Sequence, residues 1–211
     1  SPLGNSASAL EILMSKNLLN LVPQNIRDYL EAEPTKQQKN HAINYLIGDN
    51  RESIFASAEA LRNDFLTFVE DEPLVGDVNE AAGIIYHKLE QVKVNDKPTA
   101  LVWGGETTVK INGTGLGGRN QELALIVAKL AHECPINKSW AFLSAGTDGR
   151  DGPTDAAGTI IDQATCERIL QSGYKIDDFL TENNSNAALR ISNDLVHTGA
   201  TGTNVADVQI L

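Results

Sequence analysis

The segment GGETTVKINGTGLGGRNQE, from Gly104 to Glu122, decides the fold because a run of glycines leads directly into an apolar sequence. Five of the six residues from Gly113 to Gly118 have small side chains or none. The apolar residues from Leu123 to Leu130 predict a helix after the glycines. Backbone amides here can approach a ligand closely, and free N–H groups of a first helical turn favour an anion. Arg119 adds a guanidinium group suited to phosphate or carboxylate.

The composition is that of a globular chain, with 41% hydrophobic and 21% charged residues among 211, enough for one large or two small domains. The net charge is −11 and no stretch collects Lys and Arg without acids, which makes nucleic acid and anionic membranes poor candidates as partners. Cys134 and Cys166 match no metal or redox spacing. Without a signal peptide or an apolar run of about 18 residues, we expect an intracellular protein, cytoplasmic or, as the alternative, mitochondrial.

Upstream of Gly104, the pattern predicts helices and one β-α-β unit. A strand over Asn44–Ile47, a helix through Leu61 and a strand over Phe65–Val69 would give a parallel pair. Asp77 is placed to cap a helix that ends near Val92. Further helices are expected over Ala9–Met14 and from Pro23 to Tyr29 or Leu30.

Downstream elements alternate in the same way. Ala100–Trp103 and Thr107–Ile111 predict two strands flanking Gly104, which could form a hairpin. Further strands are expected over Trp140–Ser144 and Val208–Leu211. Further helices are expected over Thr165–Ser172, in a short stretch that starts at Asp177, and over Ala187–Leu189.

Gly113, Gly115 and Gly118 match G-x-G-x-x-G, a weak dinucleotide-binding signal that is equally explained by a turn between a strand and a helix. The donors of Arg119 to Gln121 favour a ligand, since helix capping prefers acids, and only Glu122 fits capping.

Two later loops are also rich in ligand-binding groups. The loop Gly146–Asp155 contains Asp148 and Asp151, which could hold a divalent cation or substrate, or could be ordinary turn residues. The loop Thr198–Asn204 could bind phosphate oxygens through hydroxyls and amides, or be a tight turn. Neither a G-x-S-x-G elbow nor a Walker motif occurs.

Three loops together resemble the MOFRL domain of class-II glycerate kinases. They are GGETTV (104–109) with GGRNQE (117–122), GTDGRDGPTDAAG (146–158) and TGATGTNV (198–205). The resemblance covers about Pro98 to Leu211, and Ala9 to Asp77 resemble the closing part of that family's first, Rossmann-like domain. The chain departs from the family at Asn184, where Asp is common, and at Ala200, where Pro is common.

The resemblance implies an α/β fold: residues 1–77 closing a Rossmann-like kinase domain, 78–97 forming a linking helix and turn, and 98–211 forming a MOFRL-type domain with a mixed sheet. It implies transfer of the ATP γ-phosphoryl group to the 2-hydroxyl of D-glycerate, with Mg²⁺, in a cleft between two domains. Because the family's chain is about twice as long, this chain looks like the C-terminal half, with the N-terminal domain as its partner, and by itself it could be catalytically silent.

The resemblance and the residue chemistry together assign roles to eleven residues. We expect Arg119 and Asp151 to be catalytic, and Asp148 and Asp151 to hold the metal. The expected substrate- and nucleotide-binding residues are Glu106, Thr107, Gly115, Gly117, Gly118, Asn120, Thr201 and Asn204. Two alternatives remain: an NAD(P)-dependent hydroxypyruvate reductase that uses the Gly113 fingerprint, and a non-catalytic domain that binds a small molecule.

Overall fold

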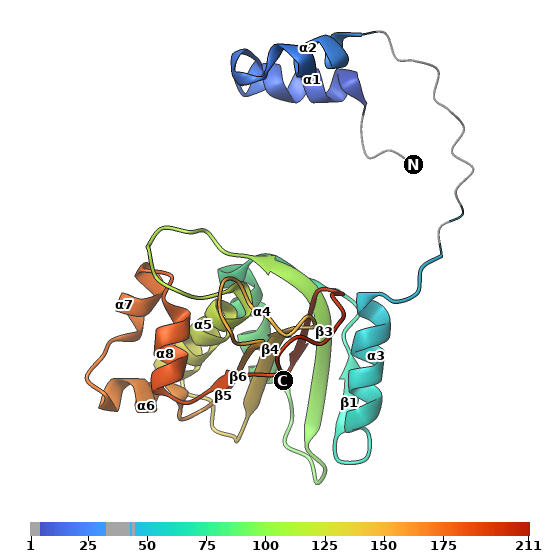
Figure 1. The fold of residues 1–211 in the computed structure, drawn as a ribbon. Helices are drawn as coiled ribbons and strands as arrows, with labels where there is room; N and C mark the ends of the chain where they lie inside the picture. Colours follow the sequence, from blue (N-terminus) through green and yellow to red (C-terminus); the bar gives the residue numbers. More distant parts are fainter. Residues whose placement is uncertain (1–4, 33–42, 44) are drawn as a thin grey trace. The chain divides into compact units, whose positions relative to one another are not determined.

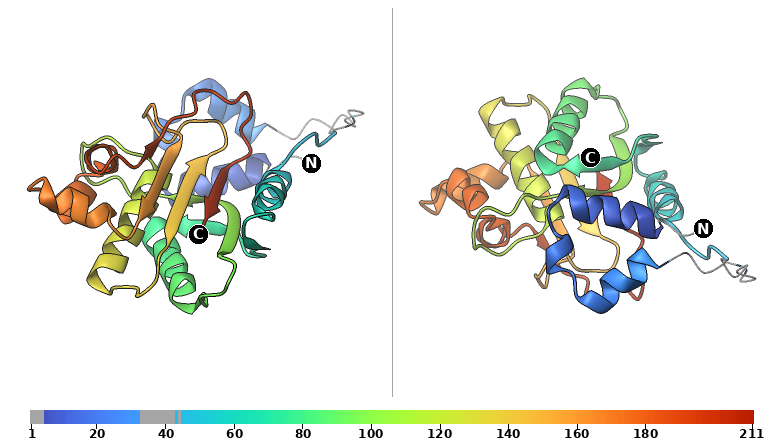
Figure 2. Two further views of the ribbon diagram at one scale, coloured as in Figure 1. Left: turned by 90° about the horizontal axis from the view of Figure 1, so that it is seen from below. Right: turned by 90° about the horizontal axis from the view of Figure 1, so that it is seen from above.

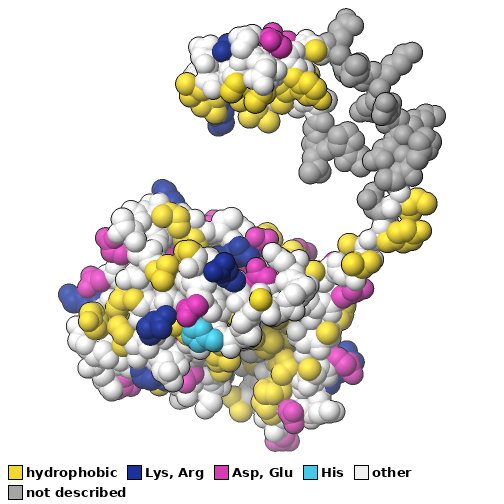
Figure 3. All heavy atoms as spheres, in the orientation of Figure 1, with side chains coloured by type: hydrophobic (Ala, Val, Ile, Leu, Met, Phe, Trp, Pro, Cys, Tyr) yellow, Lys and Arg dark blue, Asp and Glu magenta, His cyan; other side chains and the backbone are white. Residues whose placement is uncertain are grey.

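The computed structural model describes residues 5–32, 43 and 45–211, and the chain divides into two units, Ser1–Tyr45 and Leu46–Leu211 (Figure 1). In the first unit, α1 (Ser6–Ser15) and α2 (Gln24–Glu31) are joined by a 3₁₀ turn, η1 (Leu19–Leu21). Both predicted helices are present, and the side chain of Asn5 caps α1 by accepting from the amide of Ser8 at 2.8 Å. Hydrophobic side chains gather on one side of this unit (Figure 3).

The second unit is built on a mixed seven-stranded sheet, in the order β1-β3-β7-β4-β5-β6, with β2 also pairing with β3. β1 and β2 run parallel to β3, and every other pair is antiparallel. The predicted α/β class with a mixed sheet is thereby confirmed. The strands are β1 (Leu66–Val69), β2 (Leu74–Asp77), β3 (Thr99–Thr108), β4 (Ala141–Gly146), β5 (Gly158–Asp162), β6 (Leu195–Val196) and β7 (Asp207–Ile210).

β3 is one continuous strand, so the prediction of two strands around a Gly104 hinge was wrong. It is held along its whole length because β1 pairs with its first four residues, β7 with the middle, and β2 with the last four. Gly104 is needed for close packing instead, since a Cβ there would lie 1.8 Å from Oδ1 of Asn50. Residues 109–118 then leave the sheet without regular structure.

Helices cover the two faces of the sheet (Figures 1 and 2). Along β3, Leu101 and Trp103 pack with α4 and α5, whereas Val102 between them packs with α3, because side chains alternate across a strand. Asp77 caps α4 as predicted, accepting from the amide of Asn79 at 2.8 Å. The helices are α3 (Asn50–Leu61), α4 (Val78–Gln91), α5 (Arg119–Glu133), α6 (Thr165–Gln171), α7 (Ile176–Thr181) and α8 (Ser185–Ile191).

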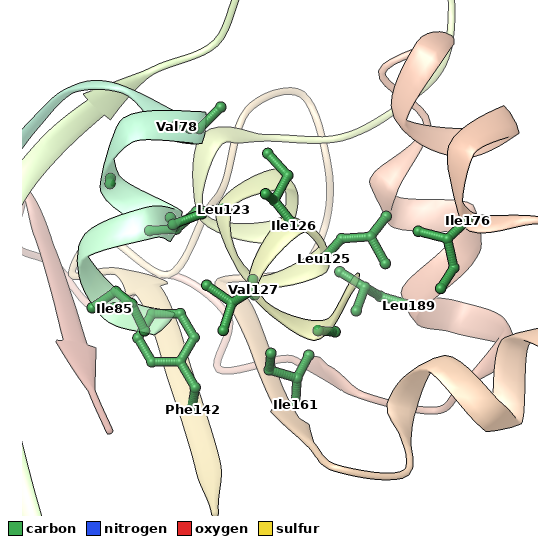
Figure 4. Packing of buried hydrophobic residues seen from close by; sticks show 14 of the residues in the cluster. Val78, Ile85, Leu123, Leu125, Ile126, Val127, Phe142, Ile161, Ile176 and Leu189 are labelled. Atoms are coloured by element: carbon green, nitrogen blue, oxygen red, sulfur yellow. The ribbon is translucent and has the colours of Figure 1, made fainter. Parts of the chain in front are cut away.

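α5 lies at the centre of the main hydrophobic core. Figure 4 shows it between α4 and the α7–α8 pair, with Phe142 of β4 and Ile161 of β5 beneath it. Its residues from Asn120 to Ala128 are all buried. A helix that is covered on every side packs through its whole circumference, which explains why an apolar run rather than an amphipathic pattern follows Arg119.

Three local predictions need correction or stay open. The strand expected over Asn44–Ile47 is absent from Tyr45 to Ile47, where the three side chains are exposed and no strand pairs with them; Asn44 lies outside the described residues. The parallel pairs are instead made by β1 and β2 with β3. Residues 46–97 belong to the same compact unit as 98–211, and the domain limits at 77 and 97 stay predictions.

The described residues contain no helix long and apolar enough to cross a membrane. Both cysteines are unpaired, with Cys134 exposed and Cys166 buried. Burial raises the pKa of the Cys166 thiol to about 12, so it is an inert neutral group of the core.

Replacing Phe142 by Ala is expected to destabilise the protein by about 3–5 kcal/mol, because it leaves a cavity beneath α5 where the ring is completely buried. Phe68→Ala on β1 is the matched control, since that ring is 49% exposed, and its cost should be well below half as large. Urea unfolding followed by circular dichroism measures both. Equal midpoints for the two variants would contradict this account of the core.

Candidate ligand-binding cleft

A cleft of about 730 Å³ opens where β3 ends and α5 begins. Its volume is in the range of small-molecule sites. The end of β3 supplies one wall, the glycine-rich segment and the first turn of α5 supply another, and Gly152, Pro153 and Asn183 close it. Of the residues predicted from the sequence, it brings together Glu106, Thr107, Gly115, Gly117, Gly118 and Arg119.

The first turn of α5 is capped by a carboxylate from a distant loop. Asp151 accepts from the backbone amides of Asn120 at 3.1 Å and Gln121 at 2.9 Å, and from both side-chain amides at 3.2 and 3.0 Å. The carboxylate therefore takes the position that an anionic ligand would take at a helix N-terminus. The prediction that these N–H groups point outward toward a ligand was wrong.

Asp151 is itself only 1% exposed. Desolvation raises its pKa, and the four hydrogen bonds act against that rise. Gly118 must be glycine for this arrangement, because a Cβ would lie 2.3 Å from the Asp151 carboxyl carbon. Asn120 is buried as well, with its Oδ1 accepting from the hydroxyl of Ser144 at 2.6 Å. Asp151 and Asn120 thus stabilise the residues that line the cleft without lining it themselves.

The glycine-rich segment packs against the turn between α7 and α8. The amide of Gly115 donates to the carbonyl of Glu182 at 2.7 Å, and that of Leu116 to Oδ1 of Asn184 at 3.1 Å. A Cβ on Gly113 would lie 2.3 Å from the Cα of Glu182. Steric contact with this turn therefore explains the first glycines. Among the described residues no acceptor is found for the amides of 117, 118 and 119, which leaves these three for a ligand.

Arg119 is fixed by two acids. Its Nε and Nη2 donate to Asp207 at 2.6 and 2.9 Å, and its Nη1 lies 3.1 Å from Glu106. Hydrogen bonding to the fully buried Asp207 raises the pKa of Arg119, which keeps the guanidinium charged. About a third of the side chain remains exposed in the cleft. A fork held in place on one edge presents its remaining N–H groups in a fixed direction.

The other predicted residues lie in loops beside the cleft rather than along it. The amide of Thr201 donates to the carbonyl of Asp148 at 3.4 Å, and the Thr201 hydroxyl donates to the carbonyl of Thr147 at 2.5 Å. Asp148 accepts from the amide of Arg150 at 2.9 Å, and Asn204 is exposed. Within the described part of the chain, no three His, Cys, Asp or Glu side chains gather as a metal site. The metal-binding role of Asp148 and Asp151 stays a prediction.

Sequence reasoning missed three residues of the site. Asp207, Glu122 and Asn183 stood out only weakly, Asp207 as an acid directly before an apolar strand and Glu122 as an apparent capping residue. Glu122 instead faces the cleft and accepts from Nδ2 of Asn183 at 3.1 and 3.2 Å. Burial raises the pKa of Glu122.

The mixed sheet and the arginine-bearing cleft beside β3 define an α/β domain with a cleft whose size and positive side chain suit a small anionic ligand. Comparison with known proteins identifies the family. The chain belongs to the MOFRL family, whose model matches residues 99–207.

Three relatives illustrate the similarity. The chain is 34% identical to the glycerate 2-kinase of Pyrococcus horikoshii, covering 96% of this chain and 48% of that protein. It is 38% identical to the D-glycerate 2-kinase of Thermotoga maritima, covering 89% and 45%. A crystal structure of glycerate kinase from Thermotoga maritima superposes with a TM-score of 0.80 at 35% identity, covering 98% of this chain and 50% of that one. The chain thus spans about half the length of these relatives, in their C-terminal portion, which confirms the resemblance carried by the three loops.

Asp151→Ala is expected to lower the free energy of unfolding by about 2–4 kcal/mol, because it removes the cap and leaves buried N–H groups without an acceptor. The control is Asp155→Ala in the same loop, whose side chain is 71% exposed, with an expected change within about 0.5 kcal/mol. Denaturant unfolding of both variants measures this. If Asp151→Ala unfolds at the same midpoint as the control, Asp151 does not hold α5.

Proposed function

We propose that the chain acts as the C-terminal part of a glycerate 2-kinase, which transfers the γ-phosphoryl group of ATP to the 2-hydroxyl of D-glycerate. The observation that supports this most is the fixed, charged Arg119 in a cleft of ligand size, beside three amides that have no acceptor among the described residues. The glycerate kinases among its relatives supply the reaction class. The partner in this proposal is an N-terminal domain of the same protein, which corresponds to the half of those relatives that the chain does not cover.

Arg119 is suited to this reaction because phosphoryl transfer needs charge neutralisation and alignment more than covalent chemistry. ATP supplies the phosphoryl group when bound. Arg119 would contact a phosphoryl oxygen or the glycerate carboxylate, and the amides of Gly117 and Gly118 would orient the same anion. Asp207 cannot contact solvent, and its role is to hold the guanidinium in direction.

Magnesium has no well-formed site in the described residues. Both oxygens of Asp151 accept hydrogen bonds from α5, and Asp148 is not part of the cleft lining. Mg²⁺ usually takes only one or two protein carboxylates and completes its shell with phosphates and water. No step of the proposed reaction is therefore assigned to it.

The structure gives less support to the reductase alternative. A dinucleotide fingerprint needs the amides of its glycines and a free helix N-terminus for the pyrophosphate. Here the amides of Gly113 and Gly115 donate to Asn183 and Glu182, and Asp151 closes the helix.

Three assays on the complete polypeptide that the gene encodes separate these functions. ADP release from ATP with D-glycerate supports the kinase, and NADH consumption with hydroxypyruvate supports the reductase. A rise in Tm with D-glycerate or ATP but no turnover in either assay supports a binding domain. No ADP release under conditions where the protein is folded would contradict the proposal.

Arg119→Lys is expected to lower kcat/KM for D-glycerate at least about tenfold, because it keeps the charge beside Asp207 but loses the planar fork. Lysine is chosen over alanine, which would leave Asp207 buried without a partner and endanger the fold. The control is Arg190→Lys on α8, a side chain that is 61% exposed. A kcat/KM within twofold of wild type, at an unchanged Tm, would show that Arg119 does not contact the reacting groups.

A further inference from the structure

One group of residues in the cleft lining is acidic and polar, in contrast to Arg119. This group consists of the buried side chains of Glu122 and Thr107 and of Asn183. Glu122 has a 7% exposed fraction and Thr107 only 2%. A carboxylate repels an anion, so we expect a ligand of this cleft to place its negative group near Arg119 and a hydrogen-bond donor near Glu122.

Asn183 fixes the position of the Glu122 carboxylate. Its Oδ1 accepts from the amides of Asn112 at 2.7 Å and Gly113 at 2.9 Å, which determines the orientation of the side-chain amide. Its Nδ2 must therefore point the other way, toward Glu122 and the carbonyl of Lys110 at 3.2 Å. Asn183 also has a positive φ of 51°, which Asn tolerates better than most residues.

Glu122 and Thr107 both have hydrogen-bonding capacity left over. An ionised carboxylate can accept about four hydrogen bonds, and among the described residues only Nδ2 of Asn183 donates to Glu122. The Thr107 hydroxyl is buried and has no partner in the described part of the chain. Buried polar groups are normally paired, and both residues line the same cleft, so we look to a ligand for the missing partners.

We propose that Glu122 and Thr107 bind a hydroxyl group of the ligand whose anionic group lies at Arg119. A hydroxyl is the group that fits, because it can donate to the carboxylate and accept from the threonine at the same time. Two ligands offer this chemistry under the proposed function, on which this inference rests: the hydroxy acid that receives the phosphoryl group, and the ribose of the nucleotide.

The burial of Glu122, together with its acidic neighbours, makes the contribution of this residue to stability depend on pH. Desolvation raises the pKa of Glu122, the hydrogen bond from Asn183 lowers it, and the charges of Asp77 and Asp151 raise it further. A carboxyl group with a raised pKa contributes stability below its ordinary pKa and loses that contribution as the pH rises through the raised value. At neutral pH the charged Glu122 thus opposes folding, and a neutral residue of the same shape should not.

The test is Glu122→Gln in the complete polypeptide that the gene encodes, measured for KM and Tm at pH 7.5. We expect KM for one hydroxyl-bearing substrate to rise at least about tenfold, because a hydrogen bond to a charged group is lost. Tm should be equal to or above that of wild type. A purely structural role predicts the reverse, a lower Tm with no selective change in KM.

Thr107→Val is the second variant, and it removes the unpaired hydroxyl while keeping the shape. It should raise KM for the same substrate as Glu122→Gln without lowering Tm. Glu167→Gln, an exposed first-turn glutamate of α6, is the matched control and should change neither quantity. Unchanged KM values, within twofold for both substrates in two folded variants, would overturn the inference.

The substrate whose KM changes in the variants identifies the molecule that supplies the hydroxyl. A change confined to D-glycerate assigns the site to the phosphoryl acceptor, whereas a change confined to ATP, lost when 2′-deoxy-ATP replaces it, assigns the site to the ribose. If the wild-type protein shows no kinase activity, calorimetric Kd values for D-glycerate, ATP and 2′-deoxy-ATP replace KM, so that failure of the proposed function is seen separately. If Glu122→Gln then binds D-glycerate and ATP as tightly as wild type does, the hydroxyl site is overturned. A wild-type protein that binds none of the three ligands would overturn it as well.

Discussion

The Asp151 carboxylate, buried at the start of α5, is the interaction on which the second unit depends. α5 is the helix around which α4, α7, α8 and the sheet pack. Its first turn has N–H groups that no intrahelical carbonyl can satisfy, and in a buried position water cannot satisfy them either. Asp151 supplies the acceptor for two backbone amides and two side chains at once. The loop after β4 is thereby tied to the helix that precedes β4 in the chain.

Fixing α5 also fixes the cleft. Arg119 is the first residue of the helix, and the amide of the next residue, Asn120, donates to Asp151. The contact with Asp151 therefore also fixes the backbone from which the Arg119 side chain extends. Asp207, at the start of β7, then holds the guanidinium from the sheet side. Because both anchors are buried carboxylates, the direction of the guanidinium is set before any ligand arrives. Such preorganisation is what electrostatic stabilisation of a reacting anion requires.

The elements that could be predicted from sequence are those with a strong local signal. The apolar run after Arg119, the cap at Asp77 and the strand at 140–144 each have a pattern that needs no distant partner. β3 was misjudged because two consecutive glycines weaken a strand locally, and only pairing with β2 and β7, from distant parts of the chain, keeps it extended. The strand expected near Ile47 failed for the opposite reason: its residues favour a strand, but no neighbour pairs with them.

The candidate site shows the same limit at the level of single residues. Arg119 could be identified from sequence because its chemistry is unusual for a first helical turn, whereas the role of Asp151 depends on a contact across 30 positions. The glycines are a mixed case, since Gly113 and Gly115 are explained by contact with the 182–184 turn, and only the amides of residues 117–119 are left without an acceptor among the described residues. A glycine motif read alone therefore overstates the anion site. Unused hydrogen-bonding capacity is the better guide, and among the residues that line this cleft it includes Arg119, the adjacent amides, and Glu122 with Thr107. Under the proposal made above, a ligand that satisfies all of them carries an anionic group and a hydroxyl.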